Sequence, residues 1–600
     1  MSAGPALARP APGKRPDVPR AHYRRVLAGL ILAAAVVRLW SIDFGLPLLH
    51  ARPDERTLMS IAVQFGSGDL NPHFFHYPSL YPYLLFACYG AYYVLGRSVG
   101  VFTSLAQFTA LYDFEPGAFL LIGRVLAALL GVATVYFTAR LAESLFDRRR
   151  ALLAAALLGF TFLHVRDSHF GTSDVPMTLF ITISMLFIVR TLERGRNVDY
   201  LLAGLFAGLA ASTKYAGVFL VFPMFWAHAA DLPGRGREQV RAFFDLKLFG
   251  FLAALGGAFL VATPFALLDF PTFWRDLTSE SLHLVEGHHV DLGLGWIHHA
   301  TVSLWYGMGW PLWLVALAGF VQLIRGNRRD GVLLAAFPAA YFLFMGRGHT
   351  VFARYAIPLL PFLAIAAAWL LNEAAERLAE HAQRPRDWCA AGLAAIALAP
   401  SIGSIARFDH ALGQRDNRLV VLDWLATHVP PGSSIHQTAP GEFMDGRQWA
   451  RIPLVPSAGR LELRRTALQD EGKSPRRLQA LISYMRRPGA PVAFDEWAWS
   501  DVKQTFTSLG EPVGGLPTYI LVARHPLRRM PEPAPVVLDL IDAEYDLVQE
   551  FRAVTADPGA NVYDDQDAFF VPLAGFRELE RPGPNYELYR RGGFSAVAHR

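Results

Sequence analysis

The chain has 600 residues, of which 53% are hydrophobic, 18% charged and 13% aromatic, and its mean hydropathy is +0.26. This composition is not that of a soluble protein, and repeated apolar runs of about twenty residues indicate a polytopic membrane protein. The net charge of +5 does not favour nucleic-acid binding, because the basic residues gather between apolar runs, as they do in cytoplasmic loops. Cys88 and Cys389 lie far apart in apolar surroundings and predict neither a disulfide framework nor a thiolate metal site.

The pattern along the chain predicts three parts. Residues 1–25 are rich in Pro, Arg and Ala, and we expect a disordered basic cytoplasmic tail. Residues 26–406 predict an α-helical membrane domain of about eleven spans. Beyond residue 407 the long apolar runs stop, and strand-like runs alternate with helix-like ones. Residues 407–600 therefore predict a soluble α/β domain, on the exoplasmic side because the number of spans is odd.

The orientation follows from the basic turns, such as residues 148–150 and 235–247, which we expect on the cytoplasmic side. The run at 78–96 contains two prolines and many tyrosines, and a full crossing there would place residues 148–150 outside. We therefore expect this run to lie along the membrane surface or to re-enter. The first apolar run lacks a cleavage site and predicts an uncleaved span. The eleven expected spans are 26–42, 117–140, 151–165, 175–190, 199–213, 215–230, 248–264, 303–324, 331–346, 351–371 and 388–406.

Titratable side chains from distant parts of the chain fall on the exoplasmic face of this arrangement. Arg124, some two turns inside a span, is expected to pair with an acid of the outer loops, in a functional or a structural role. Cations on this side run against the orientation bias, and a charge near hydrocarbon costs about 2.5–3.5 kcal/mol. An anionic partner would explain them. The side chains are Asp54, Glu55, His169, Asp174, Lys214, Arg347, His349 and Arg354.

Each of these residues also has a purely structural interpretation. Asp54 and Asp174 both precede helix-prone stretches and are candidate helix N-caps. Lys214 could be a side chain that snorkels from a helix end, and Arg347 and Arg354 could be interfacial anchors. Because segments far apart in sequence deliver acids and cations to one face, a shared site is favoured over separate structural roles.

The loop at residues 283–291 contains the residue types that bind divalent metals. Its candidates are His283, Glu286, His288 and His289. Their spacing fits neither H-E-x-x-H nor a Cys/His finger, so contact of the loop with a substrate, through His288 among others, is an equal alternative to a metal site. The sequence has no phosphate-binding G-x-x-x-x-G-K-[ST] loop and no dinucleotide fingerprint after a strand. ATP-driven transport and soluble dinucleotide chemistry are therefore not supported.

Several short motifs occur in a familiar order. The acidic pair Asp54-Glu55 comes first, followed by a Ser-His-x-x-x-Ser-Asp-x-Pro turn at 168–176, Ser-Thr-Lys-Tyr at 212–215 and Arg-Tyr-Ala-Ile-Pro-Leu-Leu-Pro at 354–361. Together they resemble the GT-C superfamily of integral membrane glycosyltransferases, in particular the protein O-mannosyltransferase and aminoarabinose transferase group. The segments 564–572 and 581–585 look like the end of bacterial members of this group.

The resemblance implies transfer of a sugar, with inversion, from a polyprenyl-phosphate donor to a hydroxyl acceptor on a protein, lipid or glycan, at the exoplasmic face of a bacterial cytoplasmic membrane. It implies Asp54 as the general base, Glu55 beside it and Asp174 as a second acid. Its implied substrate-binding residues are His169, Lys214, Arg347, His349, Arg354, Arg124 and His288, of which Lys214, Arg347 and Arg354 would hold the donor phosphate. No cofactor is certain, and a divalent metal remains an alternative.

The chemistry of the residues agrees with this reading. A phosphate is already a good leaving group, so the reaction needs a base for the acceptor and cations for the phosphate. The main alternative is a secondary transporter or flippase of a lipid-linked or anionic substrate, which would carry acids inside spans near the midplane. A weaker alternative is a binding or assembly protein whose soluble domain does the work.

Overall fold

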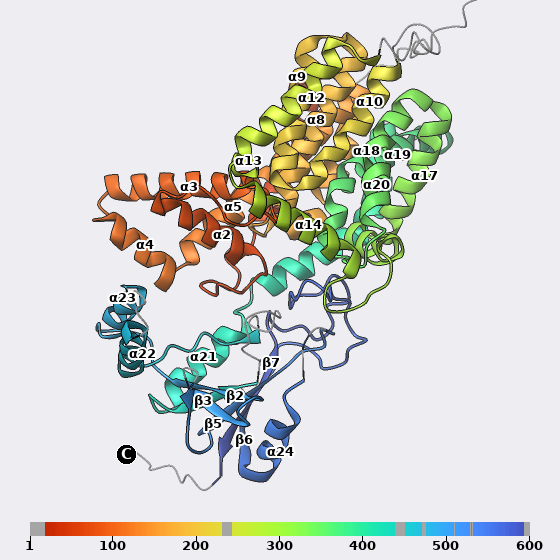
Figure 1. Cartoon of the computed structure of the whole chain (residues 1–600). Helices are drawn as coiled ribbons and strands as arrows, with labels where there is room; N and C mark the ends of the chain where they lie inside the picture. The colour runs from red at the N-terminus through yellow and green to blue at the C-terminus, as the bar shows by residue number, and fades with distance from the viewer. Residues whose placement is uncertain are drawn as a thin grey trace, which may run out of the picture.

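In the computed structural model, a helical bundle carries a lateral helical arm and a smaller mixed domain at one end (Figure 1). The structure describes residues 18–230, 243–438, 450–470, 476–508, 511–528, 530 and 532–592. Most of the expected tail, and the basic residues Arg235, Arg237 and Arg241, lie outside these residues. The first helix already begins at Arg20, inside the segment for which we expected a tail.

Each of the eleven expected spans coincides with a helix or a pair of helices. The helices of the bundle are α1 (Arg20–Leu39), α5 (Gly117–Leu145), α6 (Arg148–Gly159), α7 (Phe162–Ser168), α8 (Asp174–Arg194), α9 (Asn197–Thr213), η2 (Tyr215–Leu220), α10 (Val221–Ala230), α12 (Leu246–Ala262), α13 (Phe265–Leu268), α14 (Phe270–Glu286), α15 (Gly295–His298), η3 (His299–Ser303), α16 (Leu304–Met308), α17 (Trp310–Gly326), α18 (Arg328–Met345), η4 (Ala353–Leu359), α19 (Leu360–Ala382) and α20 (Arg386–Leu412).

The expected count of eleven spans is not confirmed. Among the described residues, four helical segments are long and apolar enough to cross a membrane, and two bent pairs raise the number to six. One reason is that the chain bends inside apolar runs, by 60° between α6 and α7 and by 115° between α16 and α17. Other expected spans form short helices, such as Tyr215–Ala230 and Leu246–Ala262.

Two glycines let α9 and α12 pack closely. A Cβ atom on Gly204 would lie 2.3 Å from the backbone oxygen of Phe251, and one on Gly208 would lie 2.3 Å from that of Leu255. The two glycines are four residues apart and therefore share one face of α9, which is the spacing that permits close contact between membrane helices.

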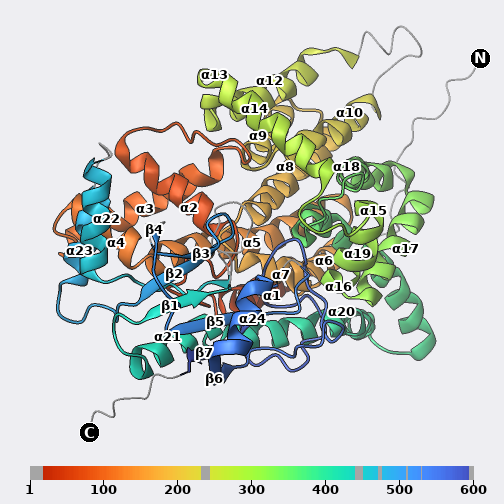
Figure 2. The ribbon, with the colours of Figure 1, turned by 60° about the horizontal axis from the view of Figure 1, so that its bottom comes forward.

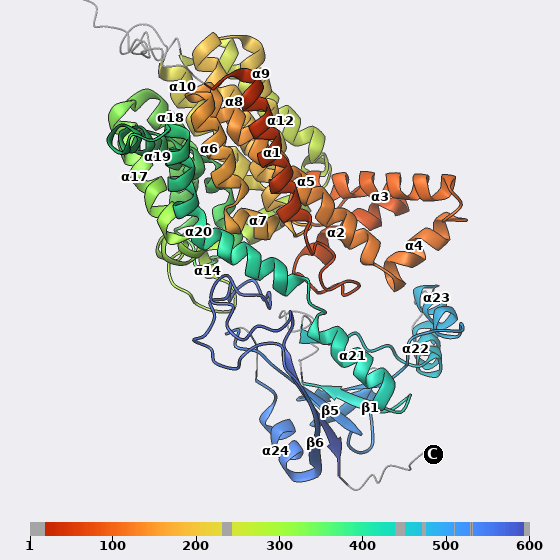
Figure 3. The same ribbon diagram turned by 180° about the vertical axis from the view of Figure 1, so that it is seen from behind.

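The lateral arm consists of α2 (Glu55–Gln64), η1 (Phe65–Ser67), α3 (Leu80–Ser98) and α4 (Leu105–Phe114). Its helices have an aromatic-rich core of their own, with Tyr81, Tyr89 and Phe119 buried in it. Helix α3, which contains most of the ambiguous run at 78–96, lies across the direction of α8 and α9 in Figures 1 and 3 rather than parallel to them. This orientation agrees with the surface-lying alternative.

The C-terminal part is a mixed seven-stranded sheet in the order β4-β3-β2-β1-β5-β7-β6. Strand β1 pairs in parallel with β2 and β5, and the remaining pairs are antiparallel. Figure 2 shows this domain in front of the end of the bundle. Its elements are α21 (Asn417–His428), β1 (Ser434–Gln437), α22 (Ala458–Asp470), α23 (Arg476–Met485), β2 (Asp495–Ser500), β3 (Thr505–Ser508), β4 (Glu511–Pro512), β5 (Tyr519–Arg524), α24 (Pro535–Glu544), β6 (Tyr545–Phe551) and β7 (Asn585–Arg591).

A loop between β6 and β7 joins the domain to the bundle. We call residues 562–574 the docking loop; a bridge between Val562 and Ala574 closes its ends. Phe569, Val571 and Leu573 belong to the main core of the bundle, whereas Phe570 belongs to the core of the C-terminal domain. Successive side chains of this extended loop thus alternate between two cores, which fixes the domain against the helices.

Candidate active site

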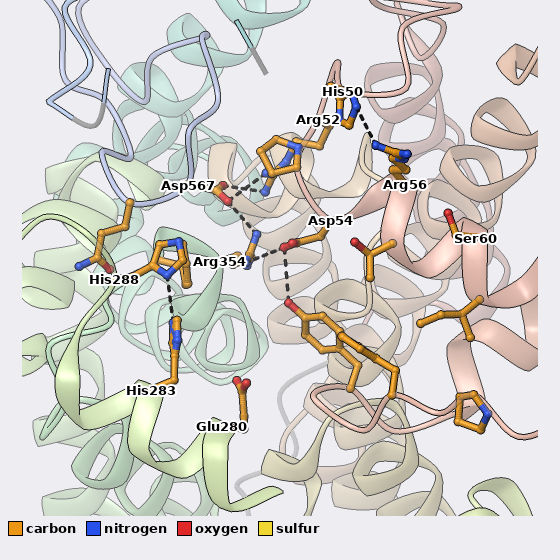
Figure 4. A pocket seen from close by; sticks show the side chains of 18 of the residues that line it. His50, Arg52, Asp54, Arg56, Ser60, Glu280, His283, His288, Arg354 and Asp567 are labelled. Atoms are coloured by element: carbon orange, nitrogen blue, oxygen red, sulfur yellow. Dashed lines mark hydrogen bonds and ion pairs between the residues drawn. The ribbon is translucent and has the colours of Figure 1, made fainter. Parts of the chain in front are cut away.

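A cavity of about 740 Å³ opens where the arm, the bundle and the docking loop meet. Four separate stretches line it, within residues 50–64, 72–77, 280–289 and 352–355, together with Gln566 and Asp567. Its volume lies within the range of about 300–1,000 Å³ that is typical of small-molecule sites. The lining mixes acids, arginines, histidines and aromatic rings, of which Figure 4 shows the arrangement.

Asp54 faces this cavity with its side chain 29% exposed. It sits immediately before α2, yet its side chain makes no capping hydrogen bond, and its backbone has a φ of +69°. One carboxylate oxygen forms an ion pair with Arg354 Nη2, at 2.8 Å, and accepts a hydrogen bond from the Tyr77 hydroxyl, at 3.4 Å. The N-cap interpretation therefore does not account for the Asp54 side chain, and the left-handed backbone turns this side chain to the cavity instead.

Tyr77 holds the second contact to Asp54 as a neutral donor. Burial, and then the negative charge of Asp54, raise the pKa of Tyr77 well above its ordinary value. The phenol therefore stays protonated and donates a hydrogen bond to the Asp54 carboxylate. Sequence reasoning missed Tyr77, because nothing distinguished it from the other tyrosines of the outer loop.

Arg354 is the centre of the charged cluster. Its guanidinium bonds Asp54 through Nη2 and Asp567 through Nη1, at 2.8 and 2.7 Å, and its Nε lies 3.9 Å from Asp174. The residue is only 4% exposed and also stacks on the ring of Phe352, at 4.3 Å. An arginine with three carboxylates around it is a component of the site and does not act as an interfacial anchor.

Asp174 and Lys214 form a buried pair behind the cavity. Lys214 Nζ lies 2.6 Å from Asp174 Oδ1, and the ammonium also lies 4.6 Å from the centre of the Tyr355 ring. Asp174 is the first residue of α8, and the preceding Ser173 occupies the N-cap position. Neither Asp174 nor Lys214 is among the residues that line the cavity. Asp174 is connected to the cavity only through Arg354, whose Nε lies 3.9 Å from it. The structure therefore does not support direct contact of Lys214 with a phosphate in the cavity.

Glu55 and Arg124 point away from the cavity. Arg124 donates to both carboxylate oxygens of Glu55, at 2.9 and 2.8 Å, and to the backbone oxygens of Ile42 and Phe44. Glu55 also accepts from the backbone nitrogen of Gly171. The expected pairing of Arg124 with an outer-loop acid is therefore present. The structure places Glu55 and Arg124 against each other, outside the lining of the cavity, where the pair ties the first loop to α5.

Three other expected substrate contacts lie elsewhere. His169 is buried, and its two ring nitrogens lie 2.9 Å from the backbone oxygen of Val165 and 3.0 Å from that of Trp40. Arg347 is exposed and stacks on a phenylalanine ring. His349 contacts the exposed Asp291 at 3.3 Å. None of the three is among the residues that line the cavity.

The histidine-rich loop contributes a wall of the cavity. His283, His288 and His289 line it together with Glu280, and the ring nitrogens of His283 and His288 lie 3.1 Å apart. Glu286 is not among the lining residues. In the described part of the chain, no group of three or more His, Cys, Asp or Glu side chains is arranged to hold a metal ion. The three histidines therefore form part of the wall of the cavity.

Two arginines of the first loop complete the site. Arg52 is fully buried and bonds both oxygens of Asp567, at 2.9 and 2.6 Å. Arg56 lines the cavity and donates to the ring of His50, at 3.0 Å. Burial, and then the Arg56 charge, lower the pKa of His50 to about 4, so the ring is neutral at pH 7. Within the described residues, Arg56 is the cavity-lining arginine with no carboxylate at ion-pair distance.

Sequence reasoning found Asp54 and Arg354 but missed Asp567, Arg52 and Arg56. Arg52 and Arg56 flank the acidic pair in sequence, and Asp567 belongs to the tail motif quoted above. The resemblance of the tail segment to the family therefore pointed to Asp567. Nothing in the sequence, however, indicated that this segment would contact the first loop, 515 residues away.

Comparison with known proteins shows similarity to one protein family and to several solved structures. Residues 101–255 match the family model described as dolichyl-phosphate-mannose-protein mannosyltransferase. The oligosaccharyltransferase of Archaeoglobus fulgidus, solved in its apo form, aligns over 95% of this chain and 89% of its own, with 12% identity and a TM-score of 0.50. The structure of ArnT from Cupriavidus metallidurans in the apo state aligns over 94% and 98%, with 14% identity and a TM-score of 0.47. No curated protein sequence matches the chain.

The fold and the matched segment show what this protein is similar to. Its fold resembles that of a solved membrane oligosaccharyltransferase, and residues 101–255 are similar to a mannosyltransferase family, in line with the order of motifs in the sequence. More narrowly, the match over residues 101–255 relates it to transferases named for a lipid-phosphate sugar donor.

Proposed function

We propose that this protein transfers a sugar from a polyprenyl-phosphate donor to a hydroxyl acceptor, with inversion, and that Asp54 is the general base. The observation that carries the proposal is the Asp54 carboxylate, turned into a 740 Å³ cavity and held there by Arg354 and Tyr77. The relation of residues 101–255 to lipid-phosphate mannosyltransferases supports the donor class.

The proposed chemical step needs a general base and a cation, and both line the cavity as Asp54 and Arg56. Asp54 removes the proton of the acceptor hydroxyl as its oxygen attacks the anomeric carbon. The bond from that carbon to the phosphate oxygen breaks, and the polyprenyl phosphate leaves with the electron pair. A positioned general base contributes about 10²–10⁴-fold to such a step. No general acid is required, because the phosphate leaves as a stable anion.

Arg56 is our candidate for the contact to the donor phosphate. Lys214 and Arg354, which the sequence suggested, are both neutralised by carboxylates, and Arg347 lies outside the cavity. Among the described residues, the guanidinium of Arg56 bonds only the side chain of the neutral His50, so its charge is available to a phosphate that becomes dianionic as it leaves.

We propose that the site opens on the exoplasmic face, and the distribution of basic residues supports this orientation. The basic turns after α5, α8 and α17 meet at the end of the bundle opposite to the cavity: Arg149 pairs with Asp387, and Arg329 donates to the backbone oxygen of Leu192. Positive residues of this kind mark the cytoplasmic side. We accordingly propose a bacterial cytoplasmic membrane with the C-terminal domain outside.

The test uses the full-length protein in lipid vesicles with radiolabelled polyprenyl-phosphate mannose as the probe. Release of free mannose and transfer to serine peptides, lipid or glycan are measured together, because the acceptor class is open. Asp54→Asn should lose at least 100-fold in rate while keeping the parent's thermal midpoint. Asp43→Asn, an exposed acid of the same loop outside the cavity, is the matched control. Full activity of Asp54→Asn would remove Asp54 from the mechanism.

A further inference from the structure

The C-terminal domain sends one charged side chain into the centre of the site. Both carboxylate oxygens of Asp567 are engaged: Oδ1 accepts from Arg52 at 2.9 Å and from Arg354 at 2.7 Å, and Oδ2 accepts from Arg52 at 2.6 Å. Arg166 lies 3.6 Å from Oδ2, and Asp567 is 1% exposed. In Figure 4, Asp567 lies between Arg52 and Arg354, and Arg354 leads on to Asp54.

The docking loop has further bonds besides those of Asp567. The Gln566 side chain accepts from the backbone nitrogen of Val351, at 2.7 Å, and donates to the backbone oxygens of Val290 and His349. Asp564 accepts from the backbone nitrogen of Ala353, at 3.0 Å. The loop thus bonds the segment that carries Arg354 on either side of residue 352, and the position of Asp567 is set by the loop as a whole.

Asp567 determines where the Arg354 guanidinium points. This group is planar and rigid, so a bond that fixes Nη1 also fixes the direction of Nη2. Nη1 is held by Asp567 and Nη2 by Asp54, each at less than 3 Å. Asp567 also shares the positive charge of Arg354. Without Asp567, only Asp54 and Asp174 would balance the charge of Arg354. Arg354 would then bind Asp54 more tightly.

We propose that Asp567 is a positioning residue of the active site, supplied by the C-terminal domain, which holds Arg354 against Asp54 and leaves the membrane part incomplete without it. The proposal rests on the function proposed above. Burial alone would raise the pKa of Asp567, but the charges of Arg52, Arg354 and Arg166 hold that pKa below its ordinary value. Asp567 is therefore ionised at neutral pH and serves as a constant counter-charge.

The experiment compares Asp567→Asn with Asp564→Asn in the full chain, with polyprenyl-phosphate mannose as the probe. Asparagine at 564 keeps an oxygen for the Ala353 nitrogen and leaves Arg354 its partner, so this variant is the matched control. Asp567→Asn should lower kcat at least tenfold and change the donor KM less than threefold, whereas Asp564→Asn should stay within twofold of the parent. An unchanged kcat in Asp567→Asn, or an equal loss in both variants, would overturn the proposal.

A second background separates positioning from a general structural effect. In Arg354→Lys, which keeps the charge but loses the planar fork, Asp567→Asn should cost less than twofold in kcat, because Asp567 acts through Arg354. A full tenfold loss in that background would contradict the proposal. If Asp567→Asn alone is unstable, the pair Arg52→Gln with Asp567→Asn removes both buried charges together and still deprives Arg354 of its partner. Tenfold loss of kcat is expected there too, and parental kcat would overturn the proposal.

Hydrogen exchange distinguishes failure of this inference from failure of the proposed function. In Asp567→Asn, amide exchange at residues 351–356 should accelerate at least fivefold, and unchanged exchange would overturn the docking role whatever the reaction. If the parent transfers no sugar from any polyprenyl-phosphate donor, the proposed function fails, and the exchange result alone then decides on the docking role. If the parent transfers sugar and Asp567→Asn does so equally well, only this inference fails.

Discussion

The Glu55 carboxylate receives two parallel hydrogen bonds from the Arg124 guanidinium, and both side chains are at most 3% exposed. Glu55 follows Asp54 directly in the chain, yet the two acids face opposite ways: Asp54 faces the cavity, and Glu55 faces the helices. One acid is thus available for chemistry, and the other fixes the loop that presents it.

The first prediction concerns this pair. Glu55→Gln should lower the free energy of unfolding by about 3–5 kcal/mol, because it leaves the buried Arg124 without its counter-charge. The fall in the thermal midpoint in detergent checks this value. In the double variant Glu55→Gln with Arg124→Gln the loss should be smaller, since no charge is left unpaired. A Glu55→Gln variant that is as stable as the parent but unable to bind donor would instead place Glu55 at the substrate.

The second prediction concerns Lys214. In Lys214→Met, Asp174 loses its cation, and the Arg354 guanidinium, 3.9 Å away, becomes its nearest partner. Arg354 should then be drawn away from Asp54, and kcat at saturating donor should fall about tenfold or more. Adding Asp174→Asn removes the competing charge and should restore part of the loss. A rise in donor KM with kcat unchanged would show that Lys214 contacts the donor directly.

The third prediction concerns Arg56. Arg56→Ala should raise the donor KM at least tenfold, because it removes the cavity arginine that has no carboxylate partner among the described residues. Arg56→Lys should recover part of the affinity through its charge. Arg347→Ala, which removes an exposed arginine outside the cavity, is the control and should leave KM unchanged. Equal effects of the Arg56 and Arg347 variants would exclude a specific phosphate contact.

The fourth prediction concerns pH. Burial, and then the charge of Asp567, raise the pKa of Asp564 from its ordinary value near 4 to about 7. At Asp564 the folded protein therefore binds more protons than the unfolded chain between about pH 4 and pH 7, so the contribution of this group to stability falls as the pH rises through this window. The lowered pKa of Asp567 acts in the opposite direction, but only below about pH 4. The change in thermal midpoint from pH 5 to pH 7.5 should be more positive in Asp564→Asn than in the parent, because the declining contribution of Asp564 is removed; the same change in both proteins would contradict the prediction.

A fifth prediction concerns the packing of α9. Gly208→Leu should separate α9 from α12, because its Cβ atom alone would lie 2.3 Å from a backbone oxygen. We expect a lower thermal midpoint and a smaller yield of folded protein. Gly256→Leu in α12, where a Cβ atom meets nothing within 4 Å, is the control. A stable Gly208→Leu variant would show that the two helices can repack.

The sequence by itself determined the class of the protein. Long apolar runs predict membrane helices, and basic turns predict their orientation, because both signals depend on local composition. The sequence also indicated that Asp54 and Arg354 belong together, because both are expected on the exoplasmic face and occur in a familiar order of motifs. It did not determine the number of spans, because bends inside apolar runs depend on contacts between helices.

Only the tertiary structure decided which charged groups meet. Asp54 and Glu55 are adjacent and share the same local sequence, so the sequence cannot tell their roles apart. The positive φ of Asp54 turns the two side chains in different directions. Ion pairs between Arg52 or Arg354 and Asp567 join positions hundreds of residues apart, and no local pattern encodes such a pairing. The physical reason is that a charge can be buried only beside its partner, and the complete fold alone brings these partners together.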